Sequence, residues 1–237
     1  MKIITFLLAL CIMLGANDIL KEIDRKLTPV STQMYKKLIN IEPDGSKKEF
    51  LIFQAKKDKD KMISLFLEPD SEKGRATLRL GENMWLYIPN VGRPLRITSM
   101  QSVVGGVFNN ADIMRLDFST EYKVVKTEDK KEYLLLELKA KNDTVSYDKL
   151  LMQVDKKTFT PLQIECYTST QMLIKTLHYK KMKDFGNGIV RPSVVETDSL
   201  LYKGFKSIMI YGQITPKEFI NEAFTLDNLS KASDLRR

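Results

Sequence analysis

Few side chains in this sequence have the type and spacing needed for chemistry. The 237 residues include one histidine and two cysteines, so neither a histidine-rich metal site nor a disulfide-stapled scaffold can be built. Cys166 and His178 lie in separate strand-like segments, and no neighbouring residue activates either of them. They could form a thiol–imidazole pair only if the fold brought them together. We therefore interpret Cys166 as a buried structural thiol.

Catalytic motifs are also missing from the sequence. It contains no GxSxG nucleophile elbow, no HExxH zinc motif and no phosphate-binding P-loop. The acidic pair Glu128-Asp129 lies in a charged turn, where both carboxylates are expected to be solvated. We predict that the protein is not an enzyme and needs no cofactor or metal ion.

The charge balance is moderately basic, with 38 Lys and Arg against 30 Asp and Glu and a formal net charge of +8. Ordinary solubility explains this charge better than an anionic partner does. Because no ribonucleoprotein signature, zinc finger or basic helix is present, we expect no nucleic-acid partner. One group of arginines is open to two interpretations, a solvated outer face of a strand pair or a basic rim that meets phospholipid head groups or holds a lid carbonyl: Arg75, Arg79, Arg93 and Arg96.

The N-terminus has the pattern of a secretory signal peptide. Lys2 precedes an apolar run, Ile3 to Leu14, and the small pair Gly15-Ala16 follows it. The run is too short to span a bilayer, which takes about 20 helical residues. We predict a signal peptide over residues 1–16 and a periplasmic mature protein. No lipid anchor is expected at Cys11, because Leu10 precedes it and because it lies inside the apolar run.

The remaining chain is predicted to be mainly β. Residues 17–27 form an amphipathic helix, after which the hydrophobic period falls to two. Strand and turn signals at close spacing favour an antiparallel meander of about eleven strands, which must curl or close. Neither a repeat nor a flexible linker divides the sequence, so one domain is expected over residues 17–237. The predicted strands cover residues 34–41, 49–55, 62–67, 76–80, 84–88, 95–98, 121–126, 133–139, 147–154, 162–168, 172–182, 189–197 and 206–214.

Two segments depart from the strand pattern. Gln101–Thr120 contains a glycine pair and many apolar residues, which fits either a long surface loop or a mobile apolar lid. Residues 216–229 begin with Pro216 and carry four large apolar side chains, which predicts a packing helix near the C-terminus.

Several motifs, weak individually, occur in an order that resembles the LolA/LolB-like superfamily of outer-membrane lipoprotein-sorting proteins. The resemblance covers nearly all of the predicted mature chain, although Asn109-Asn110 replace part of the family's usual Gly-Ser-Asp-Phe-type run. The motifs are GENMWLYIP at 81–89, GRPLRI at 92–97, GGVF at 105–108, the acidic–apolar pairs at 112–113 and 117–118, and FTLDNL at 224–229.

This resemblance implies a single strongly curved antiparallel sheet, an unclosed half-barrel, with covering helices and an apolar cavity for acyl chains. Periodicity alone would favour a packed core, and the resemblance shifts the expectation to a cavity. Alternation along strands directs every second residue inward. On that basis, with both faces of the strand at 84–88 kept open, the lipid-binding residues expected on the strands are Ile63, Leu65, Leu67, Leu78, Leu80, Trp85, Leu86 and Tyr87. The apolar segment 101–120 adds Phe108, Ile113 and Met114.

The function expected from this resemblance is that of a periplasmic carrier. It would bind the acyl chains of lipoproteins or phospholipids without covalent chemistry and deliver them toward the outer membrane. Its partners would be transient, at the inner and outer membranes. The alternative is a non-catalytic accessory or interaction module of an envelope export or transport machine, which would use an apolar surface rather than a cavity.

Overall fold

The computed structural model describes residues 16–29, 31–201 and 203–237. The predicted signal peptide, residues 1–16, therefore lies almost entirely outside the described residues and stays a prediction. The helix predicted over 17–27 is present as α1 (Ala16–Leu27). No helix in the described ranges is long and apolar enough to cross a membrane.

Thirteen strands in the described residues form one antiparallel sheet, one for each of the thirteen segments predicted above, so the summary count of about eleven was too low. The strands of the first half are β1 (Thr32–Ile41), β2 (Lys47–Lys57), β3 (Lys61–Glu68), β4 (Ala76–Leu80), β5 (Asn83–Tyr87) and β6 (Leu95–Ile97). Those of the second half are β7 (Tyr122–Asp129), β8 (Tyr133–Ala140), β9 (Lys149–Asp155), β10 (Pro161–Tyr167), β11 (Leu173–Asp184), β12 (Val190–Ser199) and β13 (Lys206–Pro216).

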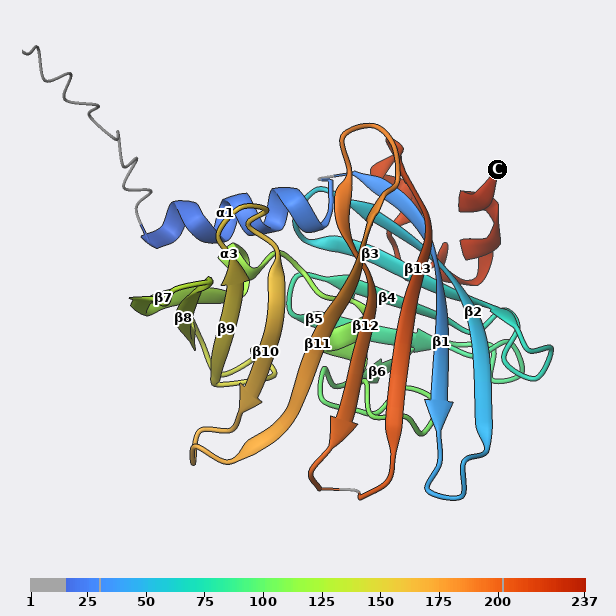
Figure 1. Ribbon diagram of the computed structural model, residues 1–237. Coiled ribbons are helices and arrows are strands. Elements are labelled where there is room, and N and C mark those ends of the chain that lie inside the picture. The colour runs from blue at the N-terminus through green and yellow to red at the C-terminus, as the bar shows by residue number, and fades with distance from the viewer. Residues whose placement is uncertain (1–15, 30, 202) are drawn as a thin grey trace, which may run out of the picture.

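The strand order shows two meanders joined side by side. The order is β6-β5-β4-β3-β2-β1-β13-β12-β11-β10-β9-β8-β7, so that β1 pairs with β13 and the edges are β6 and β7. Each meander uses short turns, such as Asp44-Gly45 between β1 and β2, where Gly45 adopts a positive φ of 84°. The sheet curls strongly and is not closed into a barrel (Figure 1). The predicted fold class of a mainly β, unclosed curved sheet is confirmed.

The chain between the two sheet edges forms the covering segment. Residues 98–121 connect β6 with β7 and carry two short helices, α2 (Asn110–Ile113) and α3 (Phe118–Glu121). Because β6 and β7 lie at opposite edges, this connection must span the open side of the sheet. Helix α1 lies against α3, β7 and β12 at the same opening (Figure 1).

The two faces of the sheet have separate apolar clusters. Side chains from α1, residues 103–118 and strands around the whole sheet converge in the larger cluster, which places it on the concave face. A smaller cluster joins β2–β5 with the C-terminal residues 219–235, and we call this side the outer face. The helix predicted over 216–229 was wrong: β13 runs to Pro216, and only the short 3-10 segments η1 (Asn221–Ala223) and η2 (Leu229–Arg236) follow.

Candidate functional site

The candidate site is the concave face beneath the lid segment, Gln101–Thr120. Phe108, Ile113 and Met114 of this segment are buried in the concave cluster together with the apolar side of α1. The lid segment is folded locally by a capping box, in which the Asn109 side chain accepts from the Asp112 N–H and the Asp112 carboxylate accepts from the Asn109 N–H. Its apolar side chains therefore fill the space that the sheet encloses.

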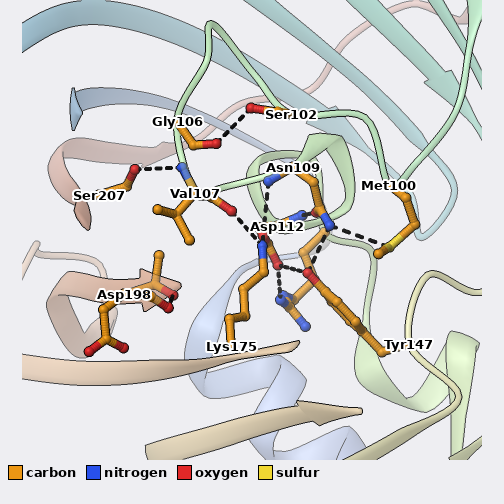
Figure 2. Close-up of polar contacts among 12 residues, drawn as sticks. Met100, Ser102, Gly106, Val107, Asn109, Asp112, Tyr147, Lys175, Asp198 and Ser207 are labelled. Carbon is orange, nitrogen blue, oxygen red and sulfur yellow. Dashed lines mark hydrogen bonds and ion pairs between the residues drawn. The ribbon is translucent and has the colours of Figure 1, made fainter. Parts of the chain in front are cut away.

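Asp112 is the centre of the polar contacts between the lid segment and the sheet (Figure 2). Its Oδ2 is 2.8 Å from Nζ of Lys175 on β11, and its Oδ1 accepts at 3.0 Å from the Tyr147 hydroxyl. Arg115 approaches the same carboxylate at 3.3 Å. Burial would raise the pKa of Asp112, but the charges of Lys175 and Arg115 hold it below its ordinary value. Asp112 therefore remains ionised in the interior.

Side chains of the sheet also hold backbone carbonyls of the lid segment. Lys36 of β1 and Gln54 of β2 each donate to the Ile113 carbonyl at 3.0 Å. Arg79 of β4 donates to the Met114 carbonyl at 2.8 Å and pairs with the buried carboxylate of Glu121. These contacts are directional and polar, so they fix the position of the segment independently of its apolar packing.

The first half of the lid segment is held to the sheet in the same way. Lys175 Nζ donates to the Val107 carbonyl at 2.6 Å, and the Val107 N–H donates to the Ser207 hydroxyl at 2.9 Å (Figure 2). Gly106 lies so close to the Asn40 side chain that an added Cβ would be 2.1 Å from its Oδ1. Only glycine allows the lid segment to approach the sheet this closely.

Asp24 connects α1 to the end of the lid segment. Its carboxylate accepts from the backbone N–H groups of Phe118 and Ser119 at 2.7 and 2.9 Å. Burial and the nearby charge of Asp117 raise the pKa of Asp24 to about 6. Asp117 itself pairs with Lys56 of β2 at 2.6 Å. The two elements that cover the concave face are thus held to each other and to the sheet.

The remaining space under this cover is small. A cavity of about 50 Å³ lies between α1, the lid segment and the sheet, which is room for a few water-sized groups and not for an acyl chain. Its lining is mixed, with apolar residues such as Leu177 and Met209 beside the charged Lys36, Arg115 and Arg191. The predicted apolar cavity is therefore not open in this structure, because α1 and the lid segment occupy the concave face.

Comparison with known proteins decides the family. A LolA superfamily protein from Nitrosomonas europaea matches with a TM-score of 0.81 and 27% identity, over 90% of this chain and 99% of that chain. A family model described only as an uncharacterised protein matches residues 58–231, more than half of the chain. This chain belongs to the LolA superfamily.

Two further solved structures share the LolA-like fold. A putative outer membrane lipoprotein-sorting protein domain from Vibrio parahaemolyticus matches with a TM-score of 0.77 and 19% identity, over 91% of this chain and 98% of that chain. A DUF1329 family protein from Desulfovibrio piger matches with a TM-score of 0.78 and 19% identity, over 90% of this chain and 97% of that chain. No curated protein matches in sequence.

The register of the sheet shows where the expected lipid-binding residues of this LolA-like chain lie. Ile63 pairs with Leu78, which pairs with Trp85, and all three face the C-terminal segment on the outer face. Leu65, Leu67, Leu80 and Tyr87 belong to the same outer cluster. By contrast, Leu86 aligns through Thr77 and Ser64 with Gln54, whose side chain contacts the lid segment.

Seven of the expected residues are thus separated from the site by the sheet itself. These residues lie on strands, as predicted. They were expected to face the concave side, however, and they face the C-terminal segment on the outer side. Sequence alternation identifies two faces and cannot say which of them is concave. Four expected residues lie on the concave side: Leu86, Phe108, Ile113 and Met114.

The expected arginine rim does not assemble. Arg79 lies on the concave face and contacts the lid segment, whereas Arg96 pairs with Trp85 in the register and so faces the other side. Arg75 binds Glu72 and stacks over Phe66, and Arg93 is exposed in the turn between β5 and β6. Arg79 alone takes part in the candidate site.

Several site residues were missed in the sequence, although a signal for them exists. Lys36 lies between Met34 and Leu38 on β1, at one of the alternating positions whose side chains are buried. Lys175 likewise lies between Leu173 and Leu177 on β11. A basic residue with apolar residues two positions before and after it in a strand is exceptional, because an unpaired charge is costly to bury. Such positions point to a charged contact inside the fold.

Cys166 and His178 do not form a thiol–imidazole pair. Cys166 is fully buried, and burial raises the pKa of its thiol to about 12. His178 pairs with Gln163 in the register and lies on the opposite face of the sheet from Cys166. Among the described residues, no cluster of His, Cys, Asp or Glu could hold a metal ion.

Proposed function

We propose that this protein is a periplasmic carrier that binds acyl chains of lipids or lipoproteins non-covalently and delivers them toward the outer membrane. It performs no chemistry on them. The observation that supports the proposal is the lid segment itself, which fills the concave face with apolar side chains and is held there by polar contacts to the sheet. An acyl chain would take the place of these side chains when the segment moves outward, and the displaced apolar side chains would then lie against the acyl chain and cover it.

The magnitudes are compatible with a reversible exchange. Withdrawing Phe108, Ile113, Met114 and Phe118 from the interior costs about 1.5–3 kcal/mol for each side chain, or roughly 6–12 kcal/mol together. A 16-carbon acyl chain gains roughly 0.8 kcal/mol for each CH₂ that it buries, or about 12 kcal/mol. The two apolar terms are of similar size, so the exchange of these side chains for an acyl chain is close to balanced before the polar contacts of the segment are counted.

Lipid analysis tests this proposal. The mature protein is purified from the periplasm, examined by native mass spectrometry, and extracted for lipids. We expect an acyl-bearing lipid bound to the wild type and lost from Phe108→Asp, since a carboxylate on the lid segment would be buried against the acyl chain.

Phe224→Ala is the matched control, because Phe224 is a buried phenylalanine of the outer face. We expect this variant to keep its lipid. Wild-type protein that never carries lipid, or a folded Phe108→Asp variant that retains it, would contradict the carrier proposal and favour an interaction module.

A further inference from the structure

The cavity under the lid segment has a cationic end. Lys36 of β1 and Arg191 of β12 line it, together with the tyrosines Tyr179 and Tyr211. Both cations lie against the ring of Tyr211, with Lys36 Nζ 5.1 Å and the Arg191 guanidinium carbon 4.0 Å from its centroid. The adjacent strands β1, β13, β12 and β11 thus bring two cationic groups and two tyrosine hydroxyls together inside the molecule.

Neither cation has an anionic partner in the described ranges. Lys36 donates to the Ile113 carbonyl. Arg191 donates to the carbonyls of Leu27 and Pro192 and to the Thr28 hydroxyl. All of these acceptors are neutral, so both charges are buried without a counter-charge.

The other buried basic side chains are different. Lys56 pairs with Asp117, Arg79 with Glu121 and Lys175 with Asp112. Burying a charge without a counter-ion is costly, and proteins compensate for it by pairing. Lys36 and Arg191 therefore mark a place where the protein keeps positive charge available.

Carboxylates of the cavity lining do not neutralise these two cations. Asp24 accepts from the Phe118 and Ser119 N–H groups, and Asp112 and Asp117 are paired with Lys175 and Lys56. Burial would raise the pKa of the Tyr211 hydroxyl, but the charges of Lys36 and Arg191, together with a hydrogen bond from Arg191, lower it below the ordinary value. The cavity end is electropositive.

We propose that this end of the cavity binds the oxyanion of an amphiphile's polar head, a phosphate or a carboxylate, with Lys36 and Arg191 as its counter-charges. Guanidinium and ammonium groups are the usual partners of such oxyanions, and both retain unused donor capacity here. A volume of about 50 Å³ suits a group of a few heavy atoms. The inference rests on the proposed carrier function and adds that the head group, as well as the tail, enters the interior.

A matched pair of lipids tests the inference. Palmitoyl lysophosphatidic acid and monopalmitoyl glycerol share the acyl chain and glycerol and differ in the phosphate. Their dissociation constants for delipidated protein are measured by isothermal titration calorimetry, with inorganic phosphate as a third ligand. We expect the phosphate-bearing lipid to bind about tenfold more tightly, which is the scale of a charge-assisted hydrogen bond.

Variants assign the preference to the two cations. In Lys36→Met and in Arg191→Met the two lipids are expected to bind within about twofold of each other, whatever change the substitution makes to the affinity that they share. Arg96→Met, which removes an exposed cation from the other face, keeps the tenfold preference. Circular dichroism and thermal melting establish that each variant is folded.

The outcomes separate the inference from the carrier proposal. If wild-type protein binds both lipids equally, or if the preference survives both substitutions, the head-group inference is overturned and the carrier remains. If neither lipid binds, the carrier proposal fails. Inorganic phosphate that binds alone, with the same loss in both variants, would identify a small oxyanion as the ligand in place of a lipid head.

Discussion

The two faces of the sheet are covered in different ways. On the concave face, α1 and the lid segment combine apolar packing with buried ion pairs and charged hydrogen bonds, such as Lys36 to Ile113 and Arg79 to Glu121. On the outer face, the C-terminal residues 219–235 pack on β2–β5 mainly through apolar side chains. Apolar contacts stabilise without direction, whereas charged contacts hold one geometry and can be exchanged for contacts with another polar partner.

This difference indicates which cover is permanent. The outer cover extends the core of the folded protein, and its loss should lower stability without changing ligand binding. The concave cover is held by contacts that another molecule can replace, and its loss should expose a binding surface.

The largest effect is expected on the outer face. Phe224 is almost fully buried and packs edge-to-face with Phe219, their ring centroids 5.9 Å apart. Phe224→Ala should lower the free energy of unfolding in urea by about 3–5 kcal/mol. Ile220→Ala, at an exposed neighbouring position, should change it by less than about 0.5 kcal/mol. A parallel loss of lipid affinity in Phe224→Ala would show that the two faces are not independent.

A smaller effect is expected for the ion pair that holds the lid segment. Arg79→Met leaves the largely buried carboxylate of Glu121 without its partner and should cost about 2–3 kcal/mol. The double variant Arg79→Met/Glu121→Leu should recover part of this loss, since it removes the unpaired carboxylate but still leaves the Met114 carbonyl without its donor. Hydrogen exchange should quicken in residues 101–121 and stay unchanged in residues 219–235. Equal acceleration in both segments would mean that the lid segment does not open separately.

The contact between Asp24 and the lid segment should make stability depend on pH. The pKa of Asp24 is raised to about 6 by burial and by Asp117, so the ionised form is disfavoured in the folded state. Its contribution is therefore most favourable below about pH 4 and is lost as the pH rises to about 6.

Asp24→Asn should remove this contribution. The difference between wild type and variant in free energy of unfolding should change by up to about 3 kcal/mol between pH 4 and pH 7. Urea unfolding at several pH values measures it. A difference that does not vary with pH would show that Asp24 has an ordinary pKa.

The smallest effect is spectroscopic. Trp85 is the one tryptophan in the sequence and packs in the outer cluster. Lipid binding should therefore leave its emission nearly unchanged, whereas removal of residues 217–237 should shift it to the red. In a Trp85→Phe background, Phe108→Trp should respond to lipid. A large Trp85 response to lipid with no change at position 108 would reverse the assignment of the two faces.

The sequence determined the elements and their order in this protein. Period-two alternation and turn residues located all of the strands within a few residues, and the amphipathic pattern located α1, because these signals depend on neighbouring residues in the chain. The apolar content of Gln101–Thr120 fits a surface loop or a lid equally, and only the structure places the segment over the concave face.

Tertiary structure alone decided which face of each strand is inside. Ile63 and Leu78 alternate as regularly as Met62 and Phe66, but the curl of the sheet and the return of the C-terminal segment assign the first pair to the outer face and the second to the concave one. The same is true of Lys36 and Arg191, 155 positions apart in the sequence, which meet at Tyr211 because β1 and β12 both adjoin β13. Alternation is a local property of the chain, whereas curvature and strand pairing depend on contacts between residues far apart in it.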